Sequence, residues 1–274
     1  MKAFLVKKFQ KFLILVEKFS IRIYLLVINI VFILVRSPVY ISYCEKNLRY
    51  FAFDKSLKKR FFFLIPSRAT GFIRGFTTRF KGISSNYLLD DLNFSHEDLV
   101  IDVGANIGDL KGYLNINGFG ETRYHAFEPS KEEFDTLKLN AQSSKLNNIG
   151  CWNESGTREF FISSENADSS FERPSSKIES IEIMRVTRLD EIYNEKIKLL
   201  KMDGEGCELE ILEGCADIFR HIEYISVDAG YERGIDNLCT FPEVSNILYS
   251  NGFFIEKFQA RGRVCGLFKN SNYP

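Results

Sequence analysis

Four acidic residues each stand at or near the end of a short apolar run: Asp102, Glu128, Asp203 and Asp228. The apolar runs are typical of buried strands, and in an open α/β sheet ligands bind outside the carboxyl ends of the strands. A carboxylate at such a place can accept two hydrogen bonds from a vicinal diol, such as that of a ribose. The pattern therefore predicts a crevice for a ribose-bearing ligand where these strands end.

The stretch from Val100 to Gly108 (VIDVGANIG) reads as a buried strand that gives way to a tight loop. A helix-compatible segment follows at residues 109–116, so backbone N–H groups and a helix N-terminus would face a bound nucleotide. The dinucleotide signature G-x-G-x-x-G lacks its second and third glycines here. The loop therefore favours a looser nucleotide site over a dinucleotide site.

Apolar segments alternate with helical segments from about residue 84, which predicts β-α-β units and a mostly parallel sheet with helices on both faces. Strands are expected at 99–103, 122–127, 148–152, 157–163, 198–202, 224–227, 253–258 and 264–268, and helices at 108–116, 130–143, 188–192, 207–216 and 243–250. The residues between the last two strands are too few for a parallel crossover and predict a hairpin. A parallel sheet with a terminal antiparallel hairpin favours S-adenosylmethionine-dependent methyltransferases.

Five motifs together resemble the FkbM family of methyltransferases. They are DVGANIG at 102–108, FEPS at 127–130, ESGT at 154–157, TRLD at 187–190 and LKMDGEGCELEILEG at 200–214. The resemblance implies a class I, Rossmann-like methyltransferase domain over 84–274, with a mostly parallel seven-stranded sheet and a C-terminal antiparallel hairpin. It also implies S-adenosylmethionine as the cofactor and O-methylation, often of sugar or polyketide hydroxyls; the acceptor that we expect is a hydroxyl of a sugar or cell-surface glycan precursor. Gly204 and Cys207 depart from the family's usual aliphatic residue and alanine.

The resemblance implies a role for each motif residue. Asp102, Gly104, Asn106 and Gly108 would line the methionine and ribose part of the cofactor, Glu128 would hold the ribose, and Trp152 or Asn153 would lie near the adenine. Asp203 would lie beside the methyl group that is transferred. The candidate catalytic carboxylates are Asp203, Glu205 and Asp228.

Structural roles compete with these assignments. Asp102 could instead cap the loop by accepting backbone N–H groups. Glu205 would stand in the first turn of a helix, where the helix dipole favours acids without any function. Asp228 could be the ion-pair partner of Arg233. Asp168-Ser169-Ser170, in a polar loop, could contact the acceptor or be plain surface, and no spacing of His, Cys, Asp and Glu predicts a metal site.

The first 82 residues carry 17 Lys and Arg against three acids, whereas the rest carry 19 against 33. This asymmetry indicates a basic appendage on an acidic body. Residues 1–36 repeat apolar side chains at helical spacing, and their longest apolar run, 23–35, would be roughly 20 Å long as a helix. Three roles stay open for them: a helix at a membrane surface, a docked helix, or a tilted transmembrane span. Residues 37–83 are expected to form a loop-rich basic connector or cap.

These features predict a cytoplasmic enzyme, held peripherally at the inner face of the plasma membrane through residues 1–36. The six scattered cysteines predict free thiols. Nucleic acid is not an expected partner, because the lysines alternate with large aliphatic residues; a small-molecule or glycan acceptor is. Two other functions stay open: a nicotinamide-dependent oxidoreductase, and a non-catalytic, membrane-tethered binding protein with the same fold.

Overall fold

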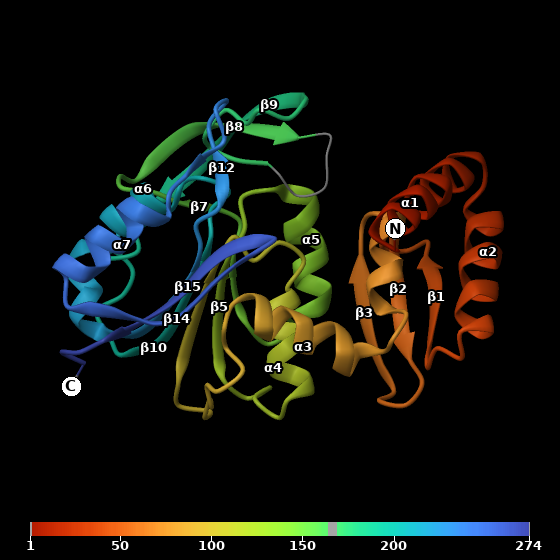
Figure 1. Ribbon diagram of the computed structural model, residues 1–274, viewed down its shortest axis with the longest axis horizontal. Coiled ribbons are helices and arrows are strands. Elements are labelled where there is room, and N and C mark those ends of the chain that lie inside the picture. Colours follow the sequence, from red (N-terminus) through yellow and green to blue (C-terminus); the bar gives the residue numbers. More distant parts are fainter. Residues whose placement is uncertain (1, 164–168, 274) are drawn as a thin grey trace.

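A seven-stranded sheet forms the centre of the computed structural model, which describes residues 2–163 and 169–273 (Figure 1). In space the strands follow the order β14-β15-β11-β10-β4-β5-β6. Their bounds are Leu99–Val103 (β4), Arg123–Phe127 (β5), Lys145–Asn147 (β6), Ile197–Asp203 (β10), Ile222–Asp228 (β11), Phe253–Arg261 (β14) and Arg263–Asn270 (β15). Every pairing is parallel except the two that β15 makes with β11 and β14. The predicted parallel sheet with a terminal antiparallel hairpin is confirmed.

Helices cover both faces of this sheet, and the sheet separates two hydrophobic cores. The helices are Asp109–Ile116 (α4), Lys131–Asn140 (α5), Glu208–Glu213 (α6) and Phe241–Ser250 (α7), with the 3-10 helix Ala216–His221 (η2) after α6. Strand β4 is buried along its whole length, and its alternate residues enter different cores: Val100 joins one, whereas Ile101 and Val103 join the other. This double burial explains why the central strands read as continuous apolar runs.

Two charged residues interrupt these apolar runs at the same level of the sheet. Lys201 of β10 is the register partner of Asp102 of β4, so the two side chains stand on neighbouring strands. Both are buried. Charged side chains are almost never fully buried unless they are paired, so this pair marks a special place in the sheet.

The structure corrects the sequence prediction after β5. The last strand at this edge, β6, ends at Asn147, before the expected strand at 148–152. Of those residues only Gly150–Cys151 (β7) is a strand, and it joins a second sheet with Gly156–Ser163 (β8) and Ile178–Thr187 (β9). Between β6 and β7, the Asn148 amide donates to the carbonyl oxygens of Glu128 (2.9 Å) and Pro129 (2.8 Å). The helix expected at 188–192 is absent, and turns replace it. The short pair Tyr231–Arg233 (β12) and Leu238–Cys239 (β13) forms a further hairpin.

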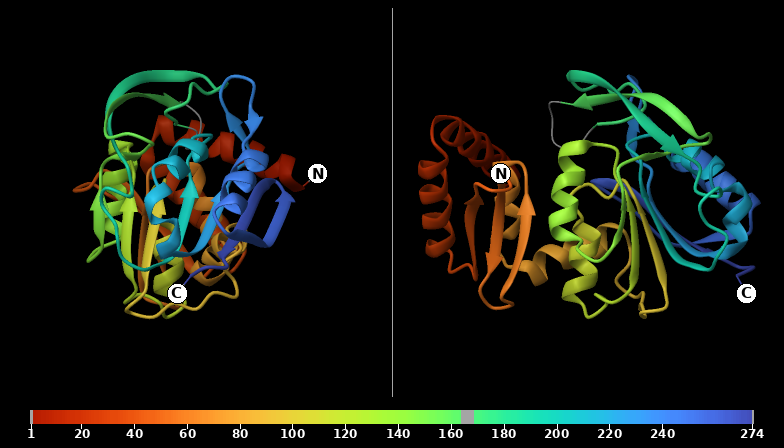
Figure 2. Two further views of the ribbon diagram at one scale, coloured as in Figure 1. Left: turned by 90° about the vertical axis from the view of Figure 1, so that its left-hand side faces the viewer. Right: turned by 180° about the vertical axis from the view of Figure 1, so that it is seen from behind.

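Residues 2–72 form a separate layer beside the large domain, which we call the small lobe (Figures 1 and 2). Its elements are Lys2–Phe19 (α1), Ile21–Leu34 (α2), Val39–Cys44 (β1), Arg49–Asp54 (β2), Lys59–Phe63 (β3) and the 3-10 helix Pro66–Phe72 (η1). The expectation of a loop-rich connector is wrong, because β1, β2 and β3 form an antiparallel sheet. Burial alternates along β2, where Tyr50, Ala52 and Asp54 face inward. The sequence therefore carries the period of two that is typical of a strand, and the prediction of a loop did not take it into account.

The N-terminal segment is two helices, with a break at Ser20. The Ser20 hydroxyl accepts a hydrogen bond from the backbone N–H of Ile23 (3.4 Å) and so caps the start of α2. Within the residues that the structure describes, no helix combines the length and the apolar character needed to cross a membrane.

Aromatic packing joins the small lobe to the large domain through Phe76–Asn86 (α3), which contacts α4. Phe80 of α3 is 1% exposed, with its ring centroid 5.1 Å from that of Phe61 and 5.7 Å from that of Phe76. The ring also lies against Gly112 of α4, where an added Cβ would come within 2.3 Å of it. One continuous core therefore runs from β3 to the sheet.

We expect Phe80→Ala to lower the free energy of unfolding by about 3–5 kcal/mol, because it leaves a cavity between lobe and sheet. Urea unfolding followed by fluorescence measures the change. Tyr249→Ala is the control, since Tyr249 is 77% exposed on α7, and it should change stability by less than about 0.5 kcal/mol. Equal effects of the two substitutions would contradict a shared core.

Candidate active site

A cavity of about 380 Å³ opens where β4, β5 and β10 end. Its walls include the loop at 104–106, the end of β5 with Glu128, and the loop at 203–205. Arg68 and Tyr87, which precede the sheet in sequence, complete the lining. The volume lies within the range of about 300–1,000 Å³ that small-molecule sites occupy. The predicted crevice at the strand ends is therefore present.

The glycine loop is held in place by close backbone contacts. Gly104 has φ 68°, and a Cβ at this position would lie 1.9 Å from the carbonyl oxygen of Asp203. Only glycine permits both this backbone conformation and this approach. The backbone N–H groups of Gly104 and Ala105 both donate to the carbonyl oxygen of Phe127, each at 3.1 Å. These contacts fix the loop between β5 and β10, so that Asn106 faces the cavity.

The two carboxylate oxygens of Glu128 could each accept a hydrogen bond from a diol. Each of its oxygens already accepts one backbone donor: Oε2 from Asn106 N–H (2.7 Å) and Oε1 from Ser130 N–H (2.9 Å). Both oxygens therefore keep capacity for one more donor. Burial, assisted by the negative charge of Glu133, raises the pKa of Glu128 to about 8. The Asn106 side chain is held in turn, because its Oδ1 accepts from Arg68 Nη1 (2.8 Å).

A buried cation lies beneath the glycine loop. The Nζ of Lys201 lies 2.9 Å from Asp102 Oδ1 and 4.0 Å from Asp203 Oδ2, and it donates to the carbonyl oxygen of Gly104 (2.9 Å). Burial alone would lower the pKa of Lys201, but the carboxylates of Asp102 and Asp203 outweigh it and raise the pKa. In the described part of the chain, the side chain of Asp102 contacts Lys201 and the Tyr124 hydroxyl. Asp102 thus orders the loop through Lys201, and does not cap it directly.

Asp203 carries a negative charge at the cavity wall. Burial would raise its pKa, but the nearby cations Lys201 and Arg263 reverse the effect and hold the pKa below its usual value. Its Oδ2 accepts from the Tyr87 hydroxyl and from Arg263 Nη1 (3.2 Å). Its Oδ1 is buried and has no hydrogen-bond partner among the described residues. A hydrogen-bond acceptor without a partner in a cavity wall is suited to a ligand that donates a hydrogen bond.

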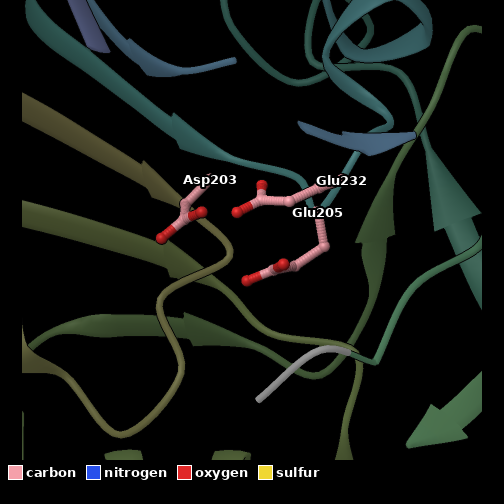
Figure 3. A group of neighbouring side chains, drawn as sticks. All are labelled: Asp203, Glu205 and Glu232. Atoms are coloured by element: carbon pink, nitrogen blue, oxygen red, sulfur yellow. The ribbon is translucent and has the colours of Figure 1, made fainter. Parts of the chain in front are cut away.

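Three carboxylates come together at the edge of the cavity, two of them from residues that line it (Figure 3). They belong to Asp203, Glu205 and Glu232, and their oxygens lie within 4.8 Å of one another. Burial, together with Asp203 and Asp228, raises the pKa of Glu232 to about 8. An all-oxygen group of this kind could hold Mg²⁺ or Ca²⁺, or accept hydrogen bonds from hydroxyl groups. The prediction from spacing missed this group, because Glu232 of β12 is brought to the other two only by folding.

Asp228 lies behind the cavity wall. It is fully buried, and its Oδ2 lies 2.5 Å from Arg263 Nη1. The expected partner Arg233 instead binds Glu210 at 2.6 Å. Burial and the neighbouring Asp203 raise the pKa of Asp228 to about 6. Asp228 is not one of the described residues that line the cavity. Its position therefore suits a residue that orients Arg263.

Three further predicted residues lie away from the cavity lining that the structure describes. The Trp152 ring is buried between Phe171 and Arg158, and the Asn153 amide donates to Glu213 (2.6 Å). Gly108 caps α4 with φ 90°. The wall expected from Trp152 and Asn153 is formed instead by Ile149, Gly150, Cys151, Phe160 and Phe171. Ser169 and Ser170 do line the cavity, while Asp168 lies outside the described residues.

Several lining residues were missed from the sequence. They are Arg68, Tyr87, Lys201 and Arg263. Glu232, whose carboxylate lies beside those of the lining residues Asp203 and Glu205, was missed as well. Only Lys201 carries a readable signal, since a lysine inside an apolar strand demands a buried partner. The others lie outside the motifs and reach the site through the tertiary fold.

The strand order, with a single antiparallel strand next to one edge, and the glycine loop that precedes the buried carboxylate of Glu128 are those of a class I methyltransferase. The family model described as methyltransferase FkbM domain matches residues 102–259. The chain therefore belongs to the FkbM methyltransferase family. This membership favours methyl transfer over the nicotinamide-dependent alternative.

Solved structures resemble the chain at low identity. An FkbM methyltransferase from Methylobacillus flagellatus KT has 19% identity and a TM-score of 0.47, over 74% of this chain and 54% of that chain. A TehB-like SAM-dependent methyltransferase from Corynebacterium glutamicum has 12% identity and a TM-score of 0.41, over 72% and 96%. The N-terminal domain of human METTL16, solved with SAH, has 13% identity and a TM-score of 0.38, over 73% and 70%. No curated protein matches the chain.

The residues present fit S-adenosylmethionine, the cofactor of this family. Glu128 offers two aligned acceptors for the ribose hydroxyls. The close approach of Gly104 to Asp203 leaves the loop backbone, and not a side chain, at the cavity. The negative charge of Asp203 suits the positive charge of the sulfonium group.

Replacing Lys201 by Met should lower the free energy of unfolding by about 3–5 kcal/mol, because two buried carboxylates lose their cation. Urea unfolding without ligand measures this. Lys198→Met, on the same strand, removes a half-buried pair with Glu223 and should cost less than about 1 kcal/mol. Adding Asp102→Asn to Lys201→Met should restore part of the loss. Equal losses for the two lysines would refute the central role of Lys201.

Cofactor affinity should rise with pH up to about 8 and then level off, because Glu128 accepts from the ribose best as a carboxylate and its pKa is about 8. Below pH 8 the affinity for S-adenosylhomocysteine should fall by about tenfold for each pH unit by which the pH is lowered. Calorimetry at several pH values measures the slope.

Two variants test whether Glu128 is the titrating group. Glu128→Gln should weaken binding and remove the slope. Glu133→Gln removes a charge that raises the pKa of Glu128, so it should move the profile to lower pH. A slope that survives in Glu128→Gln would assign it to another residue.

Proposed function

We propose that the chain transfers the methyl group of S-adenosylmethionine to a hydroxyl of a sugar or cell-surface glycan precursor. The observation that carries this proposal is the group of Asp203, Glu205 and Glu232 at one side of the cavity. Ionised carboxylates only accept hydrogen bonds, so they select donors such as hydroxyl groups. Asp203 is held ionised by its two cations, and Glu232 ionises near pH 8. A sugar presents several neighbouring hydroxyls, which suits several neighbouring carboxylates.

The residues of this chain divide the work between binding and proton transfer. Bound S-adenosylmethionine supplies a methyl group that its sulfonium sulfur activates. Asp203, kept ionised by Lys201 and Arg263, offsets positive charge and accepts from the acceptor hydroxyl. Glu232, in the ionised form that its pKa of about 8 makes available in mildly alkaline solution, accepts the proton that the hydroxyl loses. Positioning of the acceptor by these groups contributes most to the rate.

An assay for S-adenosylhomocysteine release, with free sugars, nucleotide sugars and lipid-linked sugars as acceptors, tests the proposal. Glu232→Gln should lower kcat by about 10²–10⁴-fold, while affinity for S-adenosylhomocysteine stays near that of the parent. Glu223→Gln is the control, because Glu223 pairs with Lys198 away from the cavity. Transfer to amines but to no hydroxyl would overturn the substrate class. Cofactor binding without turnover would favour the non-catalytic binding protein.

A further inference from the structure

The two N-terminal helices, α1 and α2, contact each other at the outer side of the small lobe (Figures 1 and 2). Large apolar side chains are exposed along both. They belong to Phe12, Leu15 and Phe19 on α1 and Ile23, Leu26, Ile30, Ile33 and Leu34 on α2. Their side chains are 42–83% exposed. The spacing of three and four residues places each set on one side of its helix. We call this surface the α1–α2 face.

The α1–α2 face is separate from the side of the helices that packs on the lobe. Leu13, Tyr24, Ile28 and Phe32 are at most 1% exposed and belong to the lobe's core. The hydroxyl of Tyr24 donates to the carbonyl oxygen of Pro66 in η1 (2.8 Å). The lobe's core is therefore complete without the α1–α2 face, and the fold does not account for its large apolar side chains.

Basic residues border the α1–α2 face and almost no acids do. Exposed basic side chains on the two helices and just after them are Lys8, Lys11, Lys18, Arg22 and Arg36. Glu17 is the one acidic residue in the first 44. Its Oε1 accepts from the Tyr50 hydroxyl (2.7 Å), which directs it to the lobe. The α1–α2 face thus combines an apolar centre with a positively charged border.

This combination matches a lipid surface better than a second copy of the chain. Apolar side chains of an interfacial helix enter the boundary of headgroups and acyl chains, while Lys and Arg contact anionic headgroups. A second copy would bring the same cations together, and like charges across an interface oppose association. Soluble monomers seldom expose a contiguous apolar surface of this kind.

We propose that the α1–α2 face lies on a membrane surface that carries anionic lipid, with its apolar side chains inserted below the headgroups. The small lobe then holds the enzyme at the membrane, and η1 of the same lobe supplies Arg68 to the cavity. Docking is independent of which acceptor is methylated, so it stands or falls separately from the proposed function.

Flotation of the purified full chain with vesicles tests the docking. The chain should float with vesicles that contain phosphatidylglycerol and much less with pure phosphatidylcholine, and added salt should reduce the difference. Leu26→Ser, Ile30→Ser and Ile33→Ser combined should weaken binding by at least about 100-fold. Lys11→Gln, Lys18→Gln and Arg22→Gln combined should weaken binding to phosphatidylglycerol vesicles by about 100-fold.

A matched control removes exposed apolar residues elsewhere. Ile181→Ser and Ile183→Ser on β9 with Tyr249→Ser on α7 take away side chains that are 51%, 66% and 77% exposed, and flotation should not change. Affinity for S-adenosylhomocysteine and the unfolding midpoint show that each variant is folded. Failure of the parent to float, or a stable dimer by light scattering that the Leu26, Ile30 and Ile33 variant dissociates, would overturn the proposal.

Discussion

The site depends on a positive charge that is buried inside the sheet. Removing an ammonium group from water costs several kcal/mol, and only close carboxylates recover that energy. Lys201 has one on each side, Asp102 from the neighbouring strand and Asp203 from the end of its own strand, and the ring of Tyr87 lies 4.9 Å above it. The same ammonium donates to the carbonyl oxygen of Gly104. The position of the glycine loop is thus tied to the pairing of the buried charges.

The carboxylate of Asp203 also links segments that lie far apart in the sequence. Asp203 Oδ2 is shared by the hydroxyl of Tyr87, which follows α3, and by Arg263 of β15. Arg263 is held in turn by Asp228. One carboxylate therefore joins the segment before the sheet to its last strand, and still leaves Oδ1 without a partner. The contacts that order these segments use Oδ2, so Oδ1 stays open for the ligand that we propose.

Local patterns predicted the centre of the domain and missed its surroundings. The buried strands and the terminal hairpin were readable because double burial and a five-residue connection leave few alternatives. Glu128 was readable because its motif places it at a strand end. The wall near Cys151 was not readable, because the chain leaves the central sheet after Asn147 and joins a second sheet at β7. Glu232 could not be predicted from the sequence, because the packing of its hairpin, and not its sequence neighbours, brings it to Asp203.

The carboxylates at the cavity differ in charge because their surroundings differ. Asp203 lies between two cations and stays ionised, while Glu232, buried beside Asp203 and Asp228, has a pKa of about 8. Groups whose surroundings separate their pKa values in this way divide acid, base and electrostatic roles between them. Asp203 binds its protons too weakly to be an effective base near neutral pH, and Asp228 is committed to Arg263. Of these carboxylates, Glu232 is therefore the one whose pKa suits the proton acceptor that we propose.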